Sequence, residues 1–128
     1  MEFTMNEHSF STKLPFGELE VSGNEEYGFR PYQLLVSAVT VCSGGVLRKI
    51  LNKQRLTFED IKLRADVTRN EASVNEITDI HIHFTIIGSQ ISDEKLEKAL
   101  ALTRKNCPIV QSVKDSIRIT ETFEQTKM

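Results

Sequence analysis

The spacing of hydrophobic and polar positions changes several times along the chain. Between residues 31 and 53, apolar residues occupy nearly every face of a helical projection instead of one stripe. Pro31 opens this segment, and proline is well tolerated in the first turn of a helix. The pattern therefore predicts a long helix over 31–53 that is buried on all sides and carries Cys42.

Two later segments alternate strictly between apolar and polar residues. Residues 61–68 and 80–86 follow this pattern, and turn-forming residues 70–75 separate them. Alternation is typical of half-buried strands, so we expect a hairpin. Shorter runs over residues 2–5, 8–13 and 18–21 predict two or three N-terminal strands.

The C-terminal third predicts two helices and a strand. Ser92 and the acidic residues after it form a helix start, and apolar residues continue at helical spacing as far as Cys107. Pro108 pushes the residue before it out of the helical region, so the helix should end there. A short helix over 108–114 and a final strand from about Ile117 complete the chain. The order predicts an α+β fold with a largely antiparallel sheet.

Composition narrows the classes of protein that the chain can represent. Its 128 residues, 39% hydrophobic and 27% charged, predict a single domain over 1–128. A net charge of -2 offers no excess of cations for binding nucleic acid. No secretory signal is recognisable, and the charge-free apolar stretch 34–47 is shorter than the ~20 residues that cross a bilayer. We expect a cytoplasmic protein that does not bind membranes and has a small, weakly charged partner.

The two cysteines are the candidate chemical groups. In a cytoplasmic protein they are expected to be free thiols. Cys107 precedes a predicted helix whose unpaired N–H groups stabilise an anion, although it could equally be a small buried hydrophobe. Cys42 is followed by Gly44 and Gly45, and glycine inside a helix indicates close approach of another backbone or a ligand. The alternative is that Cys42 only fills space between packed helices.

A zinc site built from Cys42, Cys107, His81 and His83 is a further interpretation, because zinc accepts sulfur and nitrogen ligands. The spacing of these residues matches no familiar zinc pattern. Both histidines fall on the polar side of a predicted strand, which favours a solvated face. The sequence therefore predicts no metal and no cofactor.

Two motifs resemble those of the superfamily of osmotically inducible protein C (OsmC) and organic hydroperoxide resistance (Ohr) proteins. The first runs from Pro31-Tyr32-Gln33-Leu34-Leu35 to Cys42-Ser43, and the second is Asn106-Cys107-Pro108-Ile109-Val110. The resemblance spans nearly the whole chain. It implies an intertwined homodimer with strands of both subunits in each sheet, two buried central helices, and two sites at the interface.

The resemblance also implies a peroxidase cycle. Cys42 would attack an organic hydroperoxide, release the alcohol and become a sulfenic acid, and Cys107 would resolve it to a disulfide. A small dithiol or lipoylated reductant would then reduce this bond. The alternative is a dimeric, non-enzymatic protein that responds to redox conditions or binds an apolar ligand.

One part of the family pattern differs in this chain. Peroxidase members carry a glutamate beside the proline, and it helps to hold an arginine over the thiolate. Here those positions are Tyr32 and Gln33, and the first arginine is Arg30. These three residues are the candidate supporting groups, with a solvated loop charge as the alternative for Arg30. The difference favours the OsmC-like branch of the superfamily.

Overall fold

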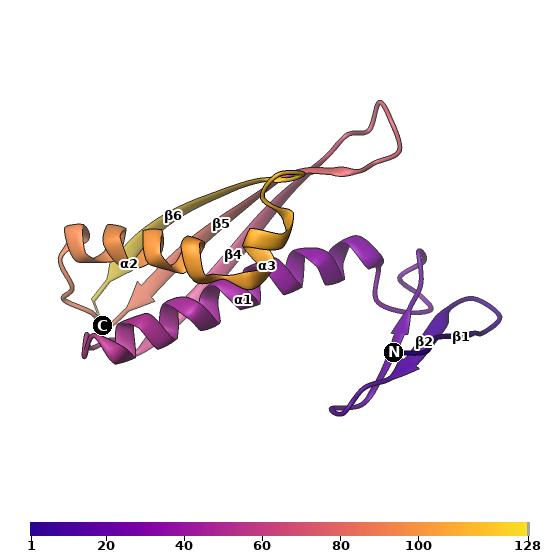
Figure 1. The fold of residues 1–128 in the computed structure, drawn as a ribbon, viewed down its shortest axis with the longest axis horizontal. Coiled ribbons are helices and arrows are strands. Elements are labelled where there is room, and N and C mark those ends of the chain that lie inside the picture. The colour runs from indigo at the N-terminus through magenta and orange to yellow at the C-terminus, as the bar shows by residue number, and fades with distance from the viewer. Residues whose placement is uncertain (128) are drawn as a thin grey trace. The chain divides into compact units, whose positions relative to one another are not determined.

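The computed structural model describes residues 1–127, which form an α+β fold as predicted (Figure 1). The chain divides into two compact units, Met1–Ser37 and Ala38–Met128, and the first helix belongs to both. The elements in chain order are β1 (Thr4–Met5), β2 (Phe10–Lys13), β3 (Glu18–Val21), α1 (Pro31–Lys53), β4 (Asp60–Arg69), β5 (Ile77–Ile87), α2 (Asp93–Asn106), α3 (Pro108–Val113) and β6 (Arg118–Thr126).

The N-terminal unit is built on an antiparallel sheet of order β1-β2-β3. The sequence predicts two or three short strands here, and the structure has three, with β1 and β2 shorter than expected. After β3 the chain folds back, and the backbone of Phe29 bonds to Glu20 and Ser22. A Cβ at Gly28 would lie 2.8 Å from the carbonyl oxygen of Glu20, so this close return requires glycine.

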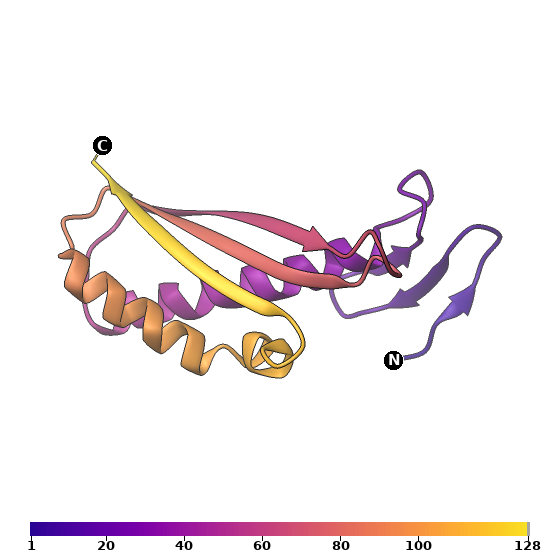
Figure 2. The same ribbon diagram turned by 90° about the horizontal axis from the view of Figure 1, so that it is seen from above.

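The C-terminal unit contains a second sheet of order β4-β5-β6. The predicted hairpin is confirmed as the antiparallel pair β4–β5. The expectation of a largely antiparallel arrangement is confirmed by three of the four strand pairings, and the exception is β6, which pairs with β5 in parallel. The reason is the connection: α2 and α3 carry the chain back along one face of the sheet, as parallel pairing requires (Figure 2).

Helix α1 has the bounds predicted from its apolar pattern, but its burial differs from the prediction. In the C-terminal unit the residues at helical spacing that face the core are buried: Val39, Thr40, Ser43, Gly44, Leu47 and Leu51. Val41 on another side is 67% exposed. The expectation of burial on all sides is therefore wrong for the single chain, whose sheet covers only one face of the helix.

By length and hydropathy alone, α1 could cross a bilayer, although its charge-free stretch is shorter than a bilayer span. Core helices of soluble proteins have the same properties, so this is weak evidence of a membrane location.

The two glycines of α1 have different surroundings. A Cβ at Gly44 would lie 2.5 Å from Cδ1 of Leu63 on β4, whereas a Cβ at Gly45 would have no neighbour within 4 Å among the described residues. The close approach predicted for this pair is therefore present at Gly44, where it seats α1 against the sheet.

We expect the Gly44→Ala and Gly45→Ala variants to differ in stability. Gly45→Ala should raise the free energy of unfolding by about 0.5–1 kcal/mol, because alanine is the better helix former. Gly44→Ala should be less stable than Gly45→Ala by about 1 kcal/mol, because Leu63 must move to admit the methyl group. Urea unfolding of both variants measures this difference. Equal stabilities would contradict the packing role of Gly44.

Candidate functional site

The candidate site is centred on the corner between α2 and α3. Pro108 excludes the helical conformation at Cys107, whose φ of -81° and ψ of 110° are extended. The backbone N–H of Cys107 still donates to Thr103 at the end of α2, and its carbonyl accepts from Gln111 at the start of α3. One residue therefore caps both helices, and its side chain is fully buried.

Helix α1 supplies the groups that meet this corner. Ser43, 2% exposed, donates a hydrogen bond from Oγ to Sγ of Cys107 at 3.7 Å. Its neighbour Cys42 is half-buried and interacts with the Cys107 side chain through a hydrogen bond. Both cysteines are free thiols. The structure thus brings together two residues that lie 65 positions apart in the chain.

The surroundings of Cys42 disfavour its thiolate. Burial raises the pKa of the Cys42 thiol, because desolvation penalises the charged form. The hydrogen bond with Cys107 raises the pKa of Cys42 further, and charge on Cys107 acts in the same direction. The backbone N–H of Ile109 opposes these effects by bonding to the Cys42 sulfur and lowering its pKa.

The start of α3 donates a hydrogen bond to the sulfur of Cys42, whereas the sequence led us to expect an effect on Cys107. Cys107 makes no side-chain hydrogen bond as the cap of α3. The N–H of Ile109, one of the N–H groups that lack a partner within the helix, is instead directed at Cys42. Cys107 is a small buried residue at this corner, as its alternative interpretation predicts, and stabilisation of an anion on Cys107 by this end of the helix stays a prediction.

The supporting residues predicted from the family pattern lie in the N-terminal unit. Arg30 precedes α1, and its guanidinium lies over the ring of Tyr32, 4.9 Å from the ring centroid. Gln33 is exposed in the first turn of α1. Arg30 is thus engaged by an aromatic ring and is not a purely solvated charge. Its role toward Cys42 stays a prediction.

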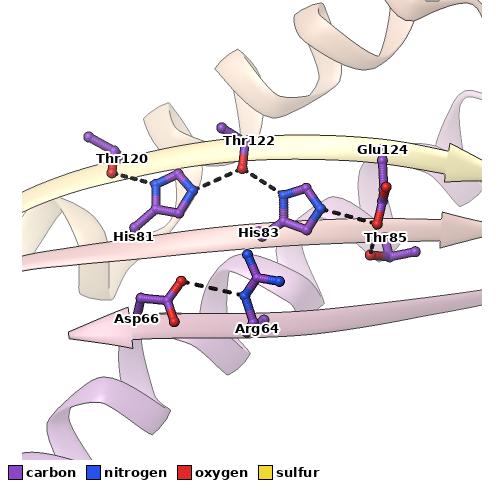
Figure 3. Close-up of polar contacts among 8 residues, drawn as sticks. All are labelled: Arg64, Asp66, His81, His83, Thr85, Thr120, Thr122 and Glu124. Carbon is purple, nitrogen blue, oxygen red and sulfur yellow. Dashed lines mark hydrogen bonds and ion pairs between the residues drawn. The ribbon is translucent and has the colours of Figure 1, made fainter.

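The two histidines project from β5 toward threonine and glutamate side chains of β6 (Figure 3), on the face opposite the buried residues of β5. His81 contacts the hydroxyl groups of Thr120 at 2.7 Å and Thr122 at 2.9 Å. His83 contacts Thr122 at 2.7 Å, and its other ring nitrogen lies 3.3 Å from Glu124. Every ring nitrogen thus has a polar partner on β6.

The four residues of the hypothetical zinc site are therefore not brought together. The alternation of β5 directs both histidines away from the core, whereas the cysteines lie on the helical side of the sheet. Within residues 1–127, no group of three or more His, Cys, Asp or Glu side chains could hold a metal ion.

Sequence reasoning missed two groups of this site, the Ser43 hydroxyl and the Ile109 N–H. Ser43 is adjacent to a cysteine, but adjacency in a helix does not say which residue contacts the second cysteine. Ile109 contributes only its backbone, which no side-chain pattern reveals. The position of Ile109 just after Cys-Pro was the one available signal, since it marks a helix start.

Comparison with known proteins places these features in a family. A family model described as OsmC-like protein matches residues 22–122. Protein YhfA of Escherichia coli is 25% identical over 95 residues, which cover 73% of this chain and 71% of YhfA.

Solved structures with a similar fold include the following two. A hypothetical protein from Aquifex aeolicus shares 26% identity with a TM-score of 0.87, over 99% of this chain and 95% of that one. An organic hydroperoxide resistance protein OsmC from Legionella pneumophila has a TM-score of 0.74 at 14% identity, over 97% of each chain. The second likeness concerns the fold alone.

We expect the Cys107→Ala variant to have a lower pKa at Cys42 than the wild type. The substitution removes the hydrogen bond and the charge repulsion of Cys107 and leaves burial as the remaining cause of the raised pKa. Because the thiolate is the reactive form, alkylation of Cys42 should reach its full rate at a lower pH in the variant.

Iodoacetamide alkylation rates at Cys42 across a pH series, followed by peptide mass spectrometry, measure this change. The unfolded chain in denaturant provides the reference for an ordinary thiol. A profile that does not move with Cys107→Ala would contradict an influence of Cys107 on Cys42.

Proposed function

Because the chain belongs to the OsmC-like protein family, within the OsmC/Ohr superfamily, we propose that it is a thiol-dependent peroxidase that reduces organic hydroperoxides. The family match agrees with the resemblance carried by the two cysteine motifs. The observation that supports the activity is the contact between Cys42 and Cys107, with the Ile109 N–H at the first sulfur. The protein acts as a single OsmC-like domain over 1–128 in the cytoplasm.

The proposed cycle uses the two sulfurs in order. The Cys42 thiolate attacks one peroxide oxygen, the O–O bond breaks, and the alcohol leaves with a proton while Cys42 becomes a sulfenic acid. The Cys107 thiolate then attacks the Cys42 sulfur, forms the disulfide and releases hydroxide, which is protonated to water. A small dithiol or lipoylated reductant restores both thiols by exchange.

Exposure supports Cys42 as the attacking sulfur. Cys42 is half-buried and can meet a substrate, whereas Cys107 is fully buried and can reach only groups within the protein. The Ile109 N–H favours the negative charge that Cys42 needs for attack. Arg30, with Tyr32 and Gln33 beside it in sequence, is the proposed source of further positive charge.

The proposed protein is a homodimer. Monomeric proteins seldom expose large contiguous apolar patches, and this single chain leaves many large apolar side chains in water. In the N-terminal unit they include Phe3, Met5, Phe10 and Phe29, and on α1 Val41 is 67% exposed. A second copy would cover them and complete the burial of α1 that its apolar pattern predicts.

A second candidate function is binding of an apolar ligand. The N-terminal unit has an open pocket of about 750 Å³ whose lining includes Phe3, Met5, Phe10 and Leu34. Such a lining suits a hydrocarbon chain or ring. Absence of peroxide turnover, together with an apolar molecule that copurifies in native mass spectrometry, would favour this function over the peroxidase.

We expect purified protein to reduce cumene hydroperoxide in the presence of dihydrolipoamide, and to reduce hydrogen peroxide more slowly, because hydrogen peroxide has no apolar surface to bury. Cys42→Ser should abolish turnover. Cys107→Ser should allow one turnover and leave a sulfenic acid on Cys42, detected by dimedone labelling. Turnover that survives Cys42→Ser would refute the proposed chemistry.

We expect the wild-type protein to sediment as a dimer and Val41→Asp to shift it toward monomer, because a buried carboxylate without a partner opposes association. Val74→Asp is the matched control: Val74 is 83% exposed in the turn between β4 and β5, and its variant should stay dimeric. Analytical ultracentrifugation distinguishes these states. A wild-type chain of monomeric mass at micromolar concentration would contradict the dimer.

A further inference from the structure

We propose that Ser43 is a positioning residue that stabilises the thiolate of Cys107 and thereby sets the redox balance of the thiol pair. The hydroxyl of Ser43 donates to Cys107 Sγ, and both side chains are buried, so water does not compete for this bond. The inference deepens the proposed peroxidase and rests on it for the step in which Cys107 acts.

Each sulfur of the pair has a donor of its own. The Ile109 N–H bonds to Cys42, and the Ser43 O–H bonds to Cys107. Ser43 and Cys42 are consecutive on α1, so the helix that carries one sulfur also carries the donor for the other. The two thiols are close enough to oppose each other's charge, and separate donors let either sulfur become the thiolate in its turn.

The Cys107 thiolate is needed at two points of the cycle. It attacks the sulfenic acid on Cys42, which forms the S–S bond and expels hydroxide. When a dithiol later attacks the Cys42 sulfur of the disulfide, Cys107 leaves as the thiolate and takes up a proton afterwards. A donor at Cys107 Sγ lowers the free energy of the thiolate, which is the form of Cys107 present in both steps. In the second step it also makes Cys107 the better leaving group, so the disulfide is reduced faster.

The donor should also change the equilibrium between disulfide and dithiol. Stabilising the thiolate stabilises the reduced protein and makes the disulfide a stronger oxidant. At a pH where Cys107 is ionised in the reduced protein, loss of the Ser43 hydroxyl should shift the equilibrium with a reference dithiol toward disulfide about three- to tenfold, the range expected for one hydrogen bond of ordinary net strength. Tenfold corresponds to about 30 mV for this two-electron couple.

The first experiment isolates Cys107 and does not depend on peroxide chemistry. In a Cys42→Ala background, the ultraviolet absorbance of the remaining thiolate is followed against pH with and without Ser43→Ala. Loss of the hydroxyl should lower the thiolate fraction about three- to tenfold in the rising part of the curve. Identical curves would overturn the proposal even if the protein proves to be an active peroxidase.

Thr40→Val is the matched control for Ser43→Ala. Thr40 is buried one turn earlier on the same helix, and within residues 1–127 its Oγ1 has no hydrogen-bond partner. Removing that hydroxyl should leave the titration unchanged, whereas a shift equal to that of Ser43→Ala would assign the effect to packing and overturn the proposal. Ser43→Thr, which keeps a hydroxyl, should restore the wild-type curve.

The second experiment uses both cysteines. The Cys42–Cys107 disulfide is equilibrated with oxidised and reduced dithiothreitol in the wild type, Ser43→Ala and Thr40→Val. A shift toward disulfide in Ser43→Ala alone is the expected result, and equal constants in all three proteins would refute the redox part of the inference. The peroxidase assay and the Cys107 titration can also give different answers. If the protein does not reduce peroxides but Ser43→Ala still shifts the titration, the proposed function is rejected and the role of Ser43 is kept.

Discussion

The backbone restriction imposed by Pro108 is the constraint on which the site depends. A residue before proline cannot continue a helix, so Cys107 must end α2 and begin α3 in an extended conformation. This geometry buries the Cys107 side chain. It also starts α3 at Pro108, which leaves the N–H of Ile109 without a partner inside the helix and available to Cys42. Both features follow from the same imino acid.

The second contribution comes from the way α1 packs. Gly44 lacks the Cβ that would collide with Leu63, so the helix can lie close to β4. The residues just before Gly44 then face the corner at Cys107, and Ser43 meets it directly. The neighbouring groups at this corner shift the pKa of Cys42 in opposite directions. Burial and the neighbouring thiol disfavour the Cys42 thiolate, and one backbone N–H favours it. The site therefore depends on donors that are already aligned when charge develops.

The distribution of apolar side chains connects the fold to the proposed assembly. In the C-terminal unit the inward residues of β5 are fully buried, among them Ile80, Ile82 and Phe84. The other side of α1 and much of the N-terminal sheet lack such cover in a single chain, as the exposure of Val41 and Phe10 illustrates. Helix α1 is apolar all round but covered on one side only, which agrees with the proposal that a second copy of the chain covers the other side.

Local patterns in the sequence determined most of the elements. Apolar spacing and Pro31 marked both ends of α1, alternation marked β4 and β5, and Ser92 marked the start of α2, where it caps the helix as predicted. These signals are local because propensity, capping and periodicity involve residues a few positions apart. The cysteine motifs also indicated the family, since their residues and spacing can be compared without coordinates.

Other features depended on tertiary structure. The parallel pairing of β6, the one-sided burial of α1 and the assignment of the Ile109 N–H to Cys42 instead of Cys107 all involve contacts between distant segments. Sequence placed Ser43 next to one thiol, but only the packing of α1 against the α2–α3 corner made it the donor to the other. The physical reason is that a side chain's direction is set by its own backbone, whereas its partner is set by how whole elements pack.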